Sequence, residues 1–497
     1  MRLSVFLIII LLFSLIGVQA QNTAASDFEN FRKEKKAEFE RFREEKKTEF
    51  ELYRKQLNEE YAAMIAGEWK AYKKEPSREI PTKPKPVKPI VVRDDSPVQP
   101  RKVVISGVTE PEKSIPDIPV TIPKITPEIR KTYPVNFTFF NTQCGIEQFD
   151  TSALSLNATD NSSLAKTWKQ LTANEKLEPL LNDCLRLREE LQLCDWAYLL
   201  LIEKVAATLY PKSADSQAFL TVALLNQSGY DCRLGIKGGK LMVMFHPSHT
   251  LYGQPYYNID GKAYFIRGQM TDENTSFYTY SGDFRKSPTP IRMTIDRYPR
   301  LSPKVSAAKT YSSASWKKAP PFEVTVNSSV VEFFNSYPQV DWHIYGLAPV
   351  SEQLQSTLFP VMEILTEGLG EEEAVNLLLS FHNYGFEYMT DGDQFGREKP
   401  FFFDENFYYP YNDCEDRAIM FAKLVNAVLG LDVVYLKFPL HLATAVKFSP
   451  GTNVKGATVS IDGQTYTVCD PTCIGAKAGY LAAEFLNARP EVHKIRL

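Results

Sequence analysis

YYPYNDCEDRA, residues 408–418, stands directly before the apolar run IMFAKLVNAVL of residues 419–429. The run carries apolar side chains at helical spacing, so we expect a helix that begins near Cys414. A cysteine on a first turn lies beside unpaired backbone N–H groups and the positive end of the helix dipole, and both favour the thiolate. The stretch therefore predicts a nucleophilic cysteine at a helix start.

A base and an orienting carboxylate for this cysteine lie downstream in strand-like sequence. His441 opens HLATAVKF, residues 441–448, and Asp470 closes QTYTVCD, residues 464–470. A helix start that carries Cys, followed by two strands that carry His and Asp, can place the three side chains in hydrogen-bond order. Any one of them alone would be weak evidence, because an isolated exported Cys is more often bridged and Asp-Pro usually marks a turn. Their joint order predicts Cys414, His441 and Asp470 as catalytic residues.

Three motifs in this order resemble the transglutaminase-like superfamily of papain-like cysteine enzymes. They are DCEDRA at 413–418, HLATAV at 441–446 and CDPT at 469–472. The resemblance implies an α+β domain with a helix packed on an antiparallel sheet, and a cysteine peptidase or amidase activity. It is confined to the C-terminal part of the chain.

The predicted reaction begins with attack of Cys414 on an amide or acyl carbonyl of a protein or peptide, which gives a thioester. Release by water would make the protein a protease or amidase, and release by a lysine amine would make it a cross-linking transglutaminase. Exported bacterial members of the superfamily are more often hydrolytic, so hydrolysis is favoured. The backbone N–H of Cys414 is one oxyanion donor, and Tyr408, Tyr409 and Tyr411 are candidates for a second donor or for the substrate cleft.

The carboxylates beside the cysteine have two interpretations. Asp413 and Glu415 are candidate calcium ligands, because similar Asp-Cys-Glu sequences occur in calcium-dependent periplasmic proteases of the superfamily. Helix capping is the alternative, since Asp and Glu are favoured on a first turn. No cofactor is otherwise required. The aromatic-rich stretch 401–411 has two readings as well: it either walls the cleft or packs under the helix.

Bulk properties exclude some classes of function. The chain has 497 residues, 44% of them hydrophobic, and a formal net charge of −3. This length predicts several domains, and the charge balance offers no basic face for a nucleic-acid partner. Seven cysteines leave at least one thiol outside any intramolecular disulfide. The rival function is a non-catalytic peptide-binding or scaffold protein of the cell envelope, in which the triad is inactive.

The N-terminal region predicts export and then a long helix. Residues 1–20 have the pattern of a cleaved signal peptide, which implies a periplasmic or secreted protein, and no later stretch reads as a transmembrane segment. Residues 21–75 are expected to form a charged helix. Within it, Phe28, Phe39, Phe50 and Tyr61 recur every eleven residues and form one stripe over 28–64. That stripe predicts self-association or docking on a partner, with a solvated spacer as the alternative.

The rest of the chain predicts an internal duplication. A Pro-rich linker at 76–134 precedes a domain at 135–300, a second linker at 301–325 and the catalytic domain at 326–497. Short matches at a nearly constant offset align the two domains and place Ala214, Lys240 and Gly268 of the first opposite the three triad residues of the second. The fold class is therefore α+β with two transglutaminase-like domains, the first a degenerate copy without a triad.

Overall fold

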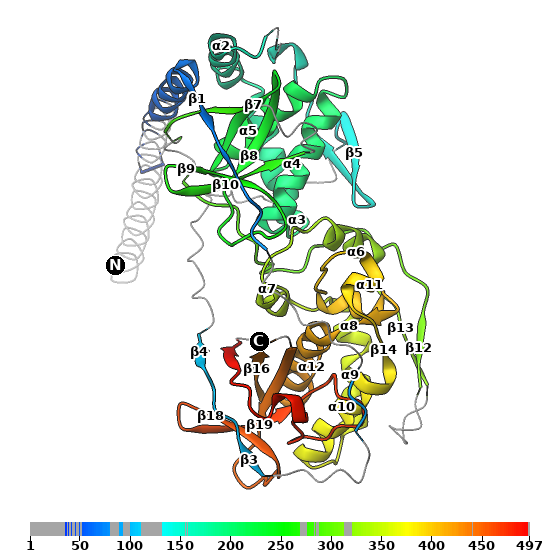
Figure 1. Cartoon of the computed structure of the whole chain (residues 1–497). Helices are drawn as coiled ribbons and strands as arrows, with labels where there is room; N and C mark the ends of the chain where they lie inside the picture. Colours follow the sequence, from blue (N-terminus) through cyan, green and yellow to red (C-terminus); the bar gives the residue numbers. More distant parts are fainter. Residues whose placement is uncertain are drawn as a thin grey trace, which may run out of the picture. The chain divides into compact units, whose positions relative to one another are not determined.

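The computed structural model describes scattered positions between 35 and 49, then residues 52–79, 89–92, 100–110 and 132–495, with short gaps at 155, 157, 269–275, 283, 285–287, 313–320 and 440. The chain divides into two compact units, Met1–Met64 and Ile65–Leu497. The larger unit combines helices with mainly antiparallel sheets, so the predicted α+β class is confirmed (Figure 1).

The predicted N-terminal helix ends earlier than expected. Residues 52–66 are helical, Gly67 interrupts the helix, and strands β1 (Trp69–Tyr72) and β2 (Lys74–Glu75) occupy the end of the predicted span. The proposed signal peptide and the stripe residues Phe28, Phe39 and Phe50 lie outside the described residues. Within the part of the chain that the structure describes, no helix combines the length and the apolar character needed to cross a membrane.

The first half of the larger unit contains several helices and strands, including a seven-stranded sheet that we call the N-terminal sheet. Its elements are β5 (Val135–Phe139), β6 (Thr142–Ile146), η1 (Thr151–Ala153), α2 (Asn161–Thr172), α3 (Leu177–Glu190), α4 (Asp195–Leu209), α5 (Ala214–Gln227), β7 (Cys232–Lys237), β8 (Lys240–Phe245), β9 (Tyr256–Ile259), β10 (Lys262–Arg267) and β11 (Phe277–Tyr280). The strand order is β1-β11-β7-β8-β10-β9-β2. Helix α5 packs against β7 and β8.

The second half also contains several helices and strands, including a seven-stranded sheet that we call the C-terminal sheet. Its elements are β12 (Lys309–Tyr311), β13 (Phe322–Val324), α6 (Ser328–Asn335), α7 (Trp342–Leu347), α8 (Glu352–Thr357), α9 (Phe359–Thr366), α10 (Glu371–Gly385), β14 (Glu387–Tyr388), α11 (Asp391–Phe395), η3 (Phe403–Phe407), β15 (Tyr411–Asn412), α12 (Cys414–Leu429), β16 (Asp432–Phe438), β17 (His441–Lys447), β18 (Ala457–Ile461), β19 (Gln464–Cys469), η4 (Ala483–Phe485) and β20 (Glu491–Lys494). The strand order is β3-β18-β19-β17-β16-β20-β4. Helix α12 packs against β16 and β17 (Figure 1).

The two sheets share one plan. In each, a helix leads into four antiparallel strands whose spatial order is first, second, fourth, third, and further strands extend both edges. The third and fourth strands are joined in both sheets by an Asp-Gly turn, Asp260-Gly261 and Asp462-Gly463, with φ positive at all four residues. A two-residue hairpin turn with positive φ at both positions favours glycine at the second, which explains why the same dipeptide occurs twice.

The residues that the sequence alignment places opposite each other occupy equivalent positions in the helices and strands of the two halves. Ala214 and Cys414 are the first residues of α5 and α12, and Lys240 and His441 are the first residues of β8 and β17. Gly268 directly follows β10, as Asp470 directly follows β19.

The proline-rich linker is more structured than the sequence suggested. Strands β3 (Arg101–Lys102) and β4 (Gly107–Thr109) pair in parallel with β18 and β20 at opposite edges of the C-terminal sheet. The stretch from Arg101 to Glu110 contains no proline, so its backbone N–H groups can join a sheet. The second predicted linker also contains structure, since β12 and β13 pair within 301–325.

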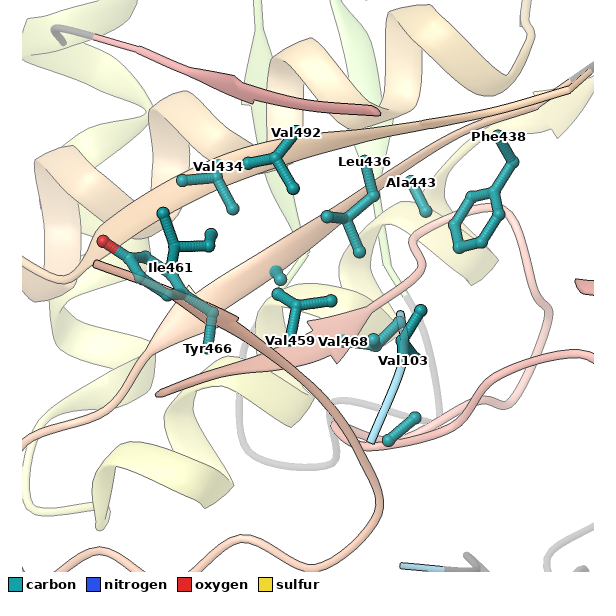
Figure 2. Close-up of a cluster of buried hydrophobic side chains, with 12 residues drawn as sticks. Val103, Val434, Leu436, Phe438, Ala443, Val459, Ile461, Tyr466, Val468 and Val492 are labelled. Carbon is teal, nitrogen blue, oxygen red and sulfur yellow. The ribbon is translucent and has the colours of Figure 1, made fainter. Parts of the chain in front are cut away.

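Figure 2 shows the core on the face of the C-terminal sheet that carries Val434 and Leu436. Alternate residues of the sheet strands point into this cluster, as a half-buried antiparallel strand requires. Val103, from the linker, is buried among them, and Ile105 packs against the same cluster. The linker therefore supplies part of the core of the sheet that carries His441.

Candidate active site

The predicted nucleophile occupies the expected place. Cys414 is the first residue of α12 and Asp413 is its N-cap, and the backbone N–H of Asp413 donates to the Asp416 carboxylate at 3.2 Å. Apolar side chains of the helix are buried from Ala418 to Val425, which fixes the helix on the sheet, and Gly430 ends it with φ 65°. This arrangement holds Cys414 at the positive end of a 16-residue helix.

His441 and Asp470 are joined directly. The Nε2 atom of His441 lies 2.7 Å from Oδ2 of Asp470, and the other carboxylate oxygen accepts the Thr472 backbone N–H at 3.0 Å. Strand β17 begins at His441 and pairs with β19, which ends one residue before Asp470. Sheet pairing therefore brings the two side chains together and leaves Nδ1 as the imidazole atom that can serve the thiol.

The electrostatics link all three predicted residues. Burial acts to lower the pKa of His441, but the charge and hydrogen bond of Asp470, with a hydrogen bond and charge from Cys414, raise it well above its usual value. Burial acts to raise the pKa of Asp470, but the charge and hydrogen bond of His441 hold it below its usual value. His441 and Asp470 therefore form an ion pair at neutral pH, and the imidazolium lies beside the thiol.

The thiol has a second partner that sequence reasoning did not identify as such. The Sγ atom of Cys414 donates to Oε2 of Glu415 at 3.1 Å. Only 3% of Cys414 is exposed, so this carboxylate is close to the nucleophile in a region of low dielectric. A negative charge here opposes formation of a thiolate, whereas His441 favours it.

Carboxylate side chains cluster at the start of α12. Carboxylate oxygens of Asp391, Asp413 and Asp416 lie within 4.8 Å of one another, and a second such group joins Asp413 and Glu415 with the Cys414 thiol. Both oxygens of Asp416 already accept backbone N–H groups, from Phe401 and Asp413, so Asp416 acts as a cap. Asp413, Glu415 and Asp391 offer the hard oxygen donors that calcium prefers.

The three tyrosines before the helix have different surroundings. The hydroxyl of Tyr409 donates to Asn335 at 2.8 Å, and its ring stacks on Phe401 with centroids 5.1 Å apart. Tyr411 belongs to β15, which pairs in parallel with β14, and Tyr408 is 37% exposed. An oxyanion or cleft role for Tyr408, Tyr409 and Tyr411 stays a prediction.

The aromatic stretch before α12 packs as a core. Phe402 stacks on Phe334 with centroids 4.2 Å apart, and Phe407 contacts Tyr311 and Phe386 at 5.9 Å and 5.5 Å. Phe401, Phe402, Phe403 and Phe407 are all buried. Of the two expectations for these phenylalanines, packing under the helix is the one that the contacts support.

Three residues around the triad were not predicted. Phe485 stacks on the His441 ring with centroids 4.9 Å apart and an angle of 9° between the planes. The Cys473 thiol donates to Oδ2 of Asp470 at 3.3 Å. Arg417 is fully buried; burial lowers its pKa to about 10, while the charges of Tyr388, Asp413, Asp416 and Asp470 act to raise it. CDPTC and EDR contained Cys473 and Arg417, but no pattern pointed to Phe485.

Comparison with known proteins adds no family to these observations. No family model, no curated protein and no solved structure matches the chain.

Proposed function

We propose that the chain is an exported, cysteine-dependent acyl-transfer enzyme that acts on protein or peptide amide bonds and releases the product to water. The observation that carries this proposal is the placement of His441, which pairs with Asp470 at 2.7 Å and interacts with the thiol of a cysteine on the first turn of a helix. A buried imidazolium beside a thiol serves nucleophilic attack, whereas a purely structural histidine has no need of both partners.

In the proposed reaction, the thiol proton of Cys414 passes to His441, and the resulting thiolate attacks the carbonyl carbon, so that a C–S bond forms as the C=O electrons move to oxygen. The backbone N–H of Cys414 faces the oxyanion. His441 gives its proton to the departing amine, and the C–N bond breaks to leave a thioester. The neutral imidazole then removes a proton from water, the hydroxide attacks the thioester, and the acid leaves as the thiol is restored. Asp470 holds the ring in one orientation throughout.

The N-terminal sheet is proposed to be a degenerate copy that binds or orients a partner. The shared strand order and the matching Asp-Gly turns support a duplication. The residues at the three triad positions are Ala214, Lys240 and Gly268, which supply no nucleophile, no imidazole and no carboxylate.

The proposed activity is tested on a mixed protein extract, with wild type compared against Cys414→Ala. Mass spectrometry would read both cleaved peptides and Lys–Gln cross-links. Cleavage that depends on Cys414 supports hydrolysis, and cross-links in its place support the transglutaminase alternative. A Cys194→Ser variant is the control, because Cys194 lies in the N-terminal half. Neither product in wild type would favour the peptide-binding or scaffold alternative.

Calcium should stabilise the folded chain if Asp413 and Glu415 hold the ion. Binding to the folded state alone adds about 2.7 kcal/mol at 100 times Kd. We expect a higher thermal midpoint in about 1 mM calcium, the range of extracellular sites. An Asp413→Asn/Glu415→Gln pair should abolish the increase, while Asp296→Asn, an exposed site in the first half, should retain it. An equal increase in both variants would assign the effect to another site.

The His441–Asp470 pair predicts a definite pH dependence of stability. The raised pKa of His441 contributes stability that is complete below about 6.5 and is lost as pH rises through the folded value. The lowered pKa of Asp470 contributes stability above about 3.9 that is lost as pH falls through the folded value. Between these limits wild type should exceed His441→Gln by about 1.5–3 kcal/mol in urea unfolding, the value of a charged hydrogen bond. A pH-independent difference would contradict the ion pair.

A further inference from the structure

A short segment of the linker is hydrogen-bonded to the loop that follows Asp470. The backbone N–H of Val92 donates to the carbonyl of Ile474 at 2.7 Å, and the backbone N–H of Ile474 donates to the carbonyl of Ile90 at 2.8 Å. The approach is close: a Cβ atom added to Gly475 would meet the Val92 carbonyl oxygen at 2.7 Å. We call residues 89–92 and 100–106 the strap.

Ile90 and Val92 of the strap pack on a buried cluster next to the triad. Ile90 and Val92 lie against a buried cluster that includes Cys473, and Phe485 packs against the same cluster. Cys473 donates to the carboxylate of Asp470, and Phe485 stacks on the ring of His441. The strap and Phe485 therefore pack on one buried cluster, and that cluster contains the Cys473 thiol that donates to Asp470.

A second part of the strap holds the other end of the same region. The Arg101 guanidinium donates to the carbonyl of Leu486, next to Phe485, and the backbone N–H of Ser106 donates to the carbonyl of Pro490 at 2.9 Å. Between these anchors Val103 is buried in the sheet core and donates its N–H to Thr458 at 2.7 Å. The region from Pro471 to Pro490 is thus held before and after Phe485.

We propose that the strap positions the triad: Ile90 and Val92 fix the loop that presents Asp470 and the Cys473 donor, and Arg101 fixes the segment that presses Phe485 on the imidazole. Cys473 contacts Asp470 directly, and Phe485 contacts His441 directly. A displaced loop would therefore change the distance between His441 and Asp470 and their charge state, as well as their burial. The catalytic machinery then includes linker residues far away in sequence. This inference rests on the proposed function only in calling the triad catalytic.

The test compares Val92→Pro with Val91→Ser in the full chain. Proline at 92 removes the N–H that bonds to Ile474, whereas the Val91 side chain is 71% exposed and serves as the control. Two measurements are made: titration of His441 by NMR of histidine-labelled protein, assigned with His441→Ala, and the rate of Cys414 alkylation as a function of pH. An Ile90→Ser/Val92→Ser pair, which keeps both backbone hydrogen bonds, gives a milder second variant.

We expect Val92→Pro to move the His441 titration toward that of an ordinary histidine and to slow alkylation about tenfold, since small displacements of reacting groups are costly. Val91→Ser should match wild type in both. An unchanged His441 titration in folded Val92→Pro and in the serine pair would overturn the positioning role. The titration does not require activity. If the wild-type thiol is inert but the His441 titration still changes in the strap variants, the proposed function is refuted and the positioning role of the strap is supported.

Discussion

Alkylation of Cys414 at about pH 6 should slow roughly 100-fold when His441 is replaced by alanine, because an imidazolium beside the sulfur favours the reactive thiolate. The imidazolium beside the sulfur is the only positive charge that the triad supplies. Turnover should fall further, by roughly 10⁴-fold, since the same ring also protonates the leaving amine. Peptide mapping after iodoacetamide treatment would identify the labelled cysteine and give its rate.

The matched control for this experiment is His249→Ala, a histidine of the N-terminal half that hydrogen-bonds to Ser248. It should label at the wild-type rate. Asp470→Asn should slow labelling less than His441→Ala does but should reduce turnover strongly, because its proposed role is to orient the ring. Equal labelling of Cys414 in wild type and His441→Ala would remove the basis for the enzyme proposal.

The free energy of unfolding should fall by about 3–5 kcal/mol in Arg417→Met, the usual cost of removing one partner from a buried ionic group. Arg417 is fully buried and donates to Asn412 at 2.9 Å and to the Phe386 carbonyl at 2.9 Å. Its charge also acts on Asp413, Asp416 and Asp470, so its loss would leave buried carboxylates uncompensated. Urea unfolding at neutral pH measures the difference.

Arg489→Met is the control for this substitution, because Arg489 is exposed and should change stability by less than about 0.5 kcal/mol. Added calcium provides a second comparison. If a cation binds among the same carboxylates, the penalty of Arg417→Met should shrink in its presence. A penalty below about 1 kcal/mol would mean that the carboxylates are neutralised by protonation and that the arginine is dispensable.

The sequence predicted the positions of the triad well because each residue lies at a boundary with a local signal. Cys414 follows Asp413, a favoured N-cap, and precedes a helical apolar pattern. His441 and Asp470 stand at the two ends of strands marked by alternating or β-branched residues. Boundary signals of this kind act over a few residues, so they can be read without tertiary information. The catalytic role of the three remains a prediction.

The parts that could not be predicted depend on contacts distant in sequence. Phe485 has no local pattern that marks it as a partner of His441; only the fold of the region after β19 places its ring there. The prediction for the linker failed for the same reason. Its proline content indicated an extended spacer, whereas Val103 is buried in the core of the C-terminal sheet. Composition indicates how a segment behaves in isolation. It does not indicate whether the segment can pair with the edge of a distant sheet or pack into the core of that sheet.

The edge strands of the C-terminal sheet impose an order on its assembly. Strand β20 lies between β16 and β4, and its contact between Glu491 and Thr109 closes a loop of 382 residues. During synthesis the N-terminal sheet has all of its strands by Tyr280, whereas β3 and β4 must wait for partners made much later. Such high contact order slows folding and leaves edges exposed in the interval. We therefore expect the N-terminal half to fold first and the half that carries Cys414 to mature last.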